Sequence, residues 1–127
     1  MHFLNKIRRF AKHYTDTAVI VDSKGEPCGK IIVRYTRGQF GTNSETGIIF
    51  HDNRVTLDCG TTAKRDPGDL SGVFDLLSGI GARVYDHGGR QFHTSNKPNQ
   101  ARVSGISMPS SFVSFRIGNR KYKILWI

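Results

Sequence analysis

Histidine, acidic and cysteine side chains in the middle of the chain are the residue types that could bind a metal ion. They are His51, His87, His93, Asp52, Asp58, Asp86 and Cys59. Their spacings match no zinc motif and no motif of two histidines and one carboxylate. His51 and His87 also lie beside expected turns, where a histidine is commonly solvated. We therefore predict no metal site and no cofactor.

A charged segment from Lys64 to Asp69 contains the residue types that a nuclease uses to hold a divalent ion. Hydrolysis of a phosphodiester needs carboxylates arranged around that ion, and the segment lacks the paired acidic-and-lysine spacing for this. Asp66-Pro67-Gly68 is typical of a turn. A turn before a capped helix accounts for the whole segment without catalysis.

Motifs for nucleophilic chemistry and for phosphate binding are also missing from the sequence. Cys28 and Cys59 have no histidine at an informative offset, and no serine lies in a Gly-x-Ser-x-Gly motif. The glycine-rich segment 38–41 lacks the lysine of a phosphate-binding loop. We predict no catalytic residue and no enzyme; an enzyme acting on nucleic acid is the most remote of three hypotheses.

Positive charge is concentrated at the two ends of the sequence. The formal net charge is +9, from 19 Lys and Arg against 10 acids. All ten acids lie between Asp16 and Asp86, and the segments on either side carry only basic charge. This layout predicts attraction to nucleic acid, to an acidic protein or to anionic lipid. The candidate contacts with an anionic partner are Lys6, Arg8, Arg9, Lys12, Arg90, Arg102, Arg116, Arg120, Lys121 and Lys123.

The last sixteen residues, 112–127, must position several of these basic side chains. Two alternating runs flank Gly118-Asn119, which favours a tight hairpin because both residues tolerate positive φ. In that register Phe115 faces Tyr122 on an apolar side. Arg116 faces Lys121 on the other side, and like charges across two strands repel. Something anionic is therefore expected to lie against them.

The remaining segments predict one domain, residues 1–127, of a mainly β (α+β) class. Residues 1–14 are expected to form a basic helical segment, and residues 15–127 a β-rich core with a helix near 69–80. Hairpins spaced along the core indicate an antiparallel barrel or sandwich. The expected strands are 16–22, 30–36, 47–51, 54–59, 82–87, 90–94 and 101–108.

The connections between these strands carry further expectations. Residues 38–47 are expected to form a surface loop and 60–68 a polar connection. Turns at Asp52-Asn53 and Gly88-Gly89 would pair Phe50 with Val55 and Tyr85 with Phe92. In the helix, Gly72 either weakens the prediction or marks close packing.

Composition gives weaker information about the compartment. Two cysteines are too few for a disulfide scaffold, so free thiols are expected, although one bridge stays open. No apolar run reaches the length of a membrane span, and the basic N-terminus lacks the apolar core of a signal peptide. These features favour no membrane and either the cytoplasm or a particle assembled there.

The closing hairpin, Phe115-Arg116-Ile117-Gly118-Asn119-Arg120-Lys121-Tyr122-Lys123-Ile124-Leu125, resembles that of the small head-completion and neck proteins of tailed phages. The resemblance covers mainly this hairpin and the overall length. It implies a compact antiparallel barrel, a ring of copies between portal and tail, and no catalytic residues. The strong positive charge departs from the acidic lining common in such channels, so the basic face would meet acidic neighbours.

Function is therefore predicted as two main hypotheses. The first is a non-enzymatic structural component of a phage particle at the head–tail connector, acting through contacts with copies of itself and neighbouring virion proteins. The alternative is a basic nucleic-acid-binding accessory or host-interference protein that contacts DNA phosphates without reading sequence. The expected localisation is the virion, assembled in the host cytoplasm, or otherwise the cytoplasm.

Overall fold

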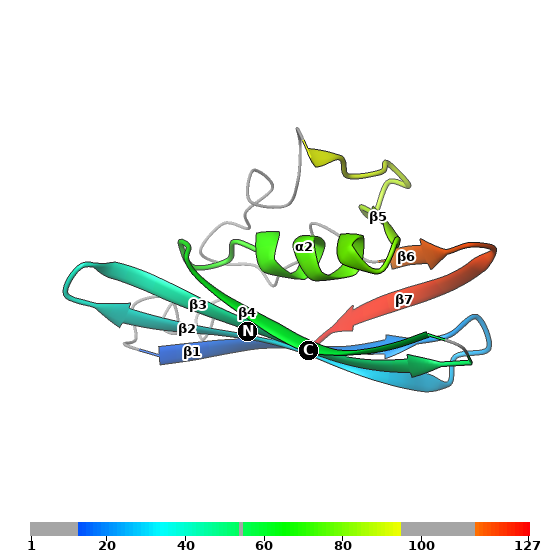
Figure 1. Ribbon diagram of the computed structural model, residues 1–127, viewed down its shortest axis with the longest axis horizontal. Helices are drawn as coiled ribbons and strands as arrows, with labels where there is room; N and C mark the ends of the chain where they lie inside the picture. The colour runs from blue at the N-terminus through cyan, green and yellow to red at the C-terminus, as the bar shows by residue number, and fades with distance from the viewer. Residues whose placement is uncertain (1–12, 54, 95–113) are drawn as a thin grey trace.

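The structure, a computed structural model, describes residues 13–53, 55–94 and 114–127 and consists there of one curved sheet and one helix (Figure 1). Every neighbouring pair of strands is antiparallel, and the spatial order is β4-β3-β2-β1-β7-β6-β5. The strands are β1 (His13–Val21), β2 (Pro27–Gly38), β3 (Gly41–Asp52), β4 (Val55–Lys64), β5 (Arg83–Tyr85), β6 (Ser114–Ile117) and β7 (Arg120–Trp126). The helix α2 (Ser71–Gly79) lies on the concave side. The predicted mainly β, antiparallel, barrel-like fold with one inserted helix is confirmed, as a half-barrel made from a single sheet.

Three aromatic rings on the concave side join the two arms of the half-barrel. Phe50 on β3 lies edge-on to Phe115 on β6, with ring centroids 5.7 Å apart. Phe115 stacks on Tyr122 of β7 at 5.0 Å, and both residues are buried. Burial of each ring stabilises the fold by roughly 2 kcal/mol. The curl of the sheet is therefore held by its apolar face.

The helix α2 packs its apolar stripe into this concavity. Leu70, Val73 and Leu77 are fully buried. A Cβ added at Gly72 would lie 2.5 Å from Thr46 Oγ1, so this glycine lets the helix approach β3 closely. Before the helix, Asp69 Oδ1 accepts hydrogen bonds from the backbone N–H and the Oγ of Ser71, at 2.9 and 2.6 Å.

The closing hairpin forms with the predicted pairing in its described part. Phe115 pairs with Tyr122 and Arg116 pairs with Lys121 across the turn. Gly118 in that turn has a φ of 59°, a conformation that costs glycine little. β7 also pairs with β1, which the local sequence pattern did not predict.

The prediction of a surface loop over residues 38–47 is wrong. β2 and β3 form a long hairpin that turns between Gly38 and Gly41, and they pair as far as Gly29 and Phe50. Residues 60–64 likewise continue β4. The inward residues Ser44 and Thr46 are buried although polar. The strand therefore lacked the apolar alternation on which the prediction depended.

Two predicted registers differ from the observed ones. Phe50 pairs with Leu57 rather than Val55, because Asp52 still pairs with Val55 and the turn therefore begins one residue later than predicted. Such a change moves the pairing by two residues and leaves every side chain on its predicted face. Tyr85 forms one isolated bridge to Gln91 rather than pairing with Phe92, and β5 pairs along its other edge with β6.

The last two residues of the predicted N-terminal helical segment, 1–14, lie in a strand instead. β1 begins at His13, so His13 and Tyr14 are extended. The rest of that helix, residues 1–12, and the strand expected over 101–108 lie outside the described residues.

Candidate docking surface for an anionic partner

Three basic side chains stand in one line across the outer face of β5, β6 and β7. Arg83 pairs directly with Arg116, and Arg116 pairs directly with Lys121. All three are exposed, and Cβ atoms of directly paired residues lie about 5 Å apart. We call Arg83, Arg116 and Lys121 the basic row; Lys123, also exposed on β7, flanks it.

The alternation of the closing hairpin produces this row. In a strand, successive side chains point to opposite faces, so the burial of Phe115 and Tyr122 forces Arg116 and Lys121 outward. The short strand β5 then brings Arg83 beside them through its pairing with β6. The pairing of β5 with β6, which is nonlocal in sequence, thus adds a third positive charge to the two of the hairpin.

Two contacts hold the arginines along the surface. An Nη of Arg83 donates a hydrogen bond to the carbonyl oxygen of Gly118 at 2.9 Å. The guanidinium of Arg116 lies 5.2 Å from the ring centroid of Tyr85, a cation–π distance. Within the described part of the chain, no carboxylate lies within ion-pair distance of the row or of Lys123. The row therefore presents uncompensated positive charge to solvent.

The structure separates the predicted contact residues into groups. Arg116, Lys121 and Lys123 lie together on the outer face. Arg120 lies on the inner face instead, with an Nη 3.9 Å from Asp52 Oδ2. Arg90 lies in the exposed turn after β5 and not in the row. The other five, Lys6, Arg8, Arg9, Lys12 and Arg102, lie outside the described residues.

Arg83 was missed among the candidates. Its sequence neighbourhood predicted a local hairpin with residues 90–94, and nothing local signals pairing with a strand thirty residues later. Alternation alone would have put it on the face opposite Val84, which is buried. That alternation is the one signal by which sequence reasoning could have placed its charge outward.

A polar pocket of about 410 Å³ adjoins the row, and Lys121 lines it. The β1–β2, β3–β4 and β6–β7 turns form its walls. Inside it, the Tyr122 hydroxyl donates a hydrogen bond to Asp52 Oδ2. Burial, and then this hydrogen bond, raise the pKa of Tyr122 above its ordinary value of 10.0, so the phenol keeps its proton and remains a donor.

Neither cysteine is in a disulfide. Burial raises the pKa of the Cys28 thiol to about 11, with smaller effects from the negative charges of Asp52 and Asp22. Only the thiolate is a good nucleophile, so Cys28 is a poorly reactive thiol at neutral pH. Cys59 is exposed on β4.

The histidines and acids considered as metal ligands lie apart. His51 Nδ1 is 2.7 Å from the Oγ1 of Thr56, while His87 and His93 are exposed. Among residues 13–53, 55–94 and 114–127, no three histidine, cysteine or acidic residues gather closely enough to hold a metal ion. In the same ranges, no helix has the length and apolar character needed to cross a membrane.

Comparisons with known proteins add no relative. The chain matches no protein-family model, no curated protein and no solved structure.

Proposed function

We propose that this chain is a non-enzymatic structural component that acts through contacts between subunits, at the head–tail connector of a tailed-phage particle. On this proposal it is a virion protein that assembles in the host cytoplasm. The observation that supports it most is the closing hairpin, which carries the resemblance to phage neck proteins and forms with the expected pairing. That hairpin joins β1 at the centre of a barrel-like antiparallel sheet, and the resemblance implies a compact antiparallel barrel.

The basic row supplies the docking surface that such a component needs. It stands on a rigid hairpin whose inner face is packed, so its charges are fixed relative to the core. Opposed positive charges on neighbouring strands destabilise the free chain, and an acidic neighbour removes that repulsion. The expected partner is therefore an acidic surface of a neighbouring virion protein.

Co-purification tests this proposal. The full chain is expected to form rings by negative-stain electron microscopy, or to co-purify with the portal or tail protein of the same phage. Arg116→Glu combined with Lys121→Glu should abolish co-purification, whereas Lys64→Glu, on β4 at the opposite edge of the sheet, should not. A chain that stays apart from these proteins, in a phage whose particles lack it, contradicts the proposal.

One observation favours a second candidate, sequence-independent binding to nucleic acid. Arg83, Arg116 and Lys121 stand at paired positions with Cβ atoms about 5 Å apart, and clustered Lys and Arg side chains supply sequence-independent affinity for phosphates. The affinity for duplex DNA should then fall steeply with salt. Arg116→Gln with Lys121→Gln should reduce the slope of log K against log salt by about 2. Absence of binding at low salt rules out this candidate.

A further inference from the structure

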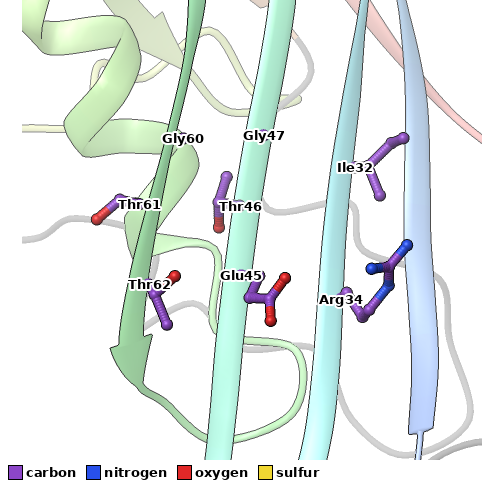
Figure 2. Close-up of a pocket in the computed structure, with 8 residues that line it drawn as sticks. All are labelled: Ile32, Arg34, Glu45, Thr46, Gly47, Gly60, Thr61 and Thr62. Atoms are coloured by element: carbon purple, nitrogen blue, oxygen red, sulfur yellow. The ribbon is translucent and has the colours of Figure 1, made fainter.

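The outer face of β3 and β4 has a patch of uncovered backbone, which forms the floor of a hollow. Gly47 and Gly60 pair directly across these strands, so two neighbouring positions of the sheet carry no side chain (Figure 2). They line a hollow of about 410 Å³. A second hollow of about 200 Å³ adjoins it around Ile49 and shares Ile32 and Gly47 with the first. Together they form a depression across β2, β3 and β4.

Apolar side chains surround this floor and remain accessible. Ile32 stands directly opposite Gly47 on β2 and leans toward β1, away from the floor (Figure 2). Ile49 is 63% exposed and Leu125 is 49% exposed. Ile49 pairs with Lys30, which in turn pairs with Val19. Val19 pairs with Leu125, so Ile49 and Leu125 lie in one row across the sheet. Ile32 and Ile49 line the two hollows, so the depression offers apolar side chains, interrupted by Lys30, to a protein surface.

The charge around the hollow differs from that of the basic row. The four charged side chains nearest to it, Lys30, Arg34, Glu45 and Asp58, sum to zero. Arg34 and Glu45 occupy paired positions on β2 and β3, one row away from Ile32 and Gly47. An anionic partner gains nothing from a neutral face, whereas a surface with matched opposite charges can complement itself.

We propose that this face packs against the same face of a second copy of the chain. Consider a two-fold axis that runs along the strands between β2 and β3. Rotation about this axis places β2 of one copy over β3 of the other, and residues of the same row stay at the same position along the strand direction. Ile32 then lies over the bare Gly47 of the second copy, and Arg34 lies over its Glu45. Each contact occurs twice, once in each direction.

The size of the face is sufficient for such a dimer. Strands β1 to β4 have 9 to 12 residues each. At about 3.3 Å per residue and 4.8 Å per strand, they cover roughly 700 Å² of plane. A standard stable interface buries about 800 Å² of accessible surface on each partner, and side-chain relief raises the plane area toward that value. Face-to-face packing of sheets is also common in β-sandwiches.

This pairing does not rest on the proposed function. The hollow lies on β2–β4 and the basic row on β5–β7, with β1 between them in the sheet. A dimer formed through the hollow therefore leaves the row open to an acidic protein or to phosphates.

Light scattering coupled to size exclusion, applied to the full chain at micromolar concentrations, is the test. The wild type should be a dimer. Gly47→Val should weaken dimerisation at least about tenfold, because a Cβ there meets no other described residue within 4 Å and the valine side chain therefore fills the hollow. At concentrations where both proteins are monomeric, the melting temperature of the variant should not fall. Ser114→Val, which adds the same side chain on the outer face of β6, should leave the dimer intact.

Charge exchange separates contacts between copies from contacts within one copy. Arg34→Glu and Glu45→Arg should each weaken the homodimer, since each variant opposes like charges across the axis. An equimolar mixture of the two variants should form the heterodimer preferentially. A monomeric wild type, a dimer unaffected by Gly47→Val, or a mixture without heterodimer preference overturns the proposal. Portal binding that survives Gly47→Val while the dimer is lost leaves the proposed function standing and supports this pairing.

Discussion

The ring of Phe50 on β3 meets the ring of Tyr122 on β7 edge to face, with centroids 5.0 Å apart and planes at 89°. β2 and β1 separate these strands in the sheet, so the contact exists only because the sheet curls. Just beyond it, Tyr122 donates its hydroxyl hydrogen to Asp52 at the end of β3. The contacts of Tyr122 with Phe50 and Asp52 therefore hold β7 against β3 and keep the sheet curled beside the basic row.

Removal of the Tyr122 hydroxyl tests that closure. Tyr122→Phe keeps the ring contacts but leaves the Asp52 carboxylate without this donor. We expect the free energy of unfolding to fall by about 1–3 kcal/mol in urea titrations. Phe50→Ala, which removes the ring itself, should cost about 3–5 kcal/mol. A Tyr122→Phe variant as stable as the wild type would show that the hydrogen bond contributes nothing.

Stability should decline at alkaline pH, and Cys28 should account for part of the decline. Burial raises its pKa from 9.0 to about 11 in the folded chain. As pH rises, the unfolded chain therefore loses this proton first. The contribution of the protonated Cys28 to the free energy of unfolding is complete below pH 9 and is lost as pH rises toward 11. In melting curves across that range, Cys28→Ala should show a shallower decline than the wild type. Cys59→Ala, at an exposed thiol, should decline as the wild type does.

Two glycines of α2 should respond differently to alanine. Gly72→Ala puts a methyl group 2.5 Å from Thr46 Oγ1, and such overpacking costs about 1–3 kcal/mol. Gly79→Ala meets nothing within 4 Å and should be neutral or stabilising by up to about 1 kcal/mol. Thermal denaturation compares the two. Adding Thr46→Ala should rescue Gly72→Ala, and a lack of rescue would place the clash elsewhere.

Two buried serines form a second matched pair. Ser44 Oγ is buried and has no hydrogen-bond partner among the described residues, whereas Ser71 Oγ donates to Asp69 at 2.6 Å. Ser44→Ala should raise the free energy of unfolding by about 1 kcal/mol, and Ser71→Ala should lower it by a similar amount. Chemical denaturation of both variants measures the difference. Equal effects would mean that the Ser44 hydroxyl is satisfied in solution.

The repulsion within the basic row should be visible in the free chain. Lys121→Glu replaces a like-charge pair with an opposite-charge pair across from Arg116. The melting temperature should rise at low salt, by the equivalent of roughly 0.2–1 kcal/mol, and the gain should shrink as salt screens it. The same variant should bind acidic protein or DNA less well. A loss of stability at every salt concentration would contradict the arrangement of the row.

Much of the local structure was readable from the sequence. The glycine-asparagine turn and the alternation on either side predicted the pairing of Phe115 with Tyr122, because turn chemistry and side-chain period act over a few residues. The apolar stripe near residues 69–80 was also sufficient to predict the helix α2. Prediction failed over residues 41–47 because the inward positions Ser44 and Thr46 are polar. Thr46 lies against Gly72 of the helix, a contact that no local pattern reveals.

The sequence by itself determined which side chains of each hairpin share a face, and hence that Arg116 and Lys121 stand together outside. Only the tertiary structure decided that Arg83 joins them, that Asp52 lies within reach of Arg120, and that Gly47 lies beside Gly60. The reason is the range of the interactions. Alternation is set by the backbone of one strand, whereas the order and curl of seven strands are set by which apolar faces pack together.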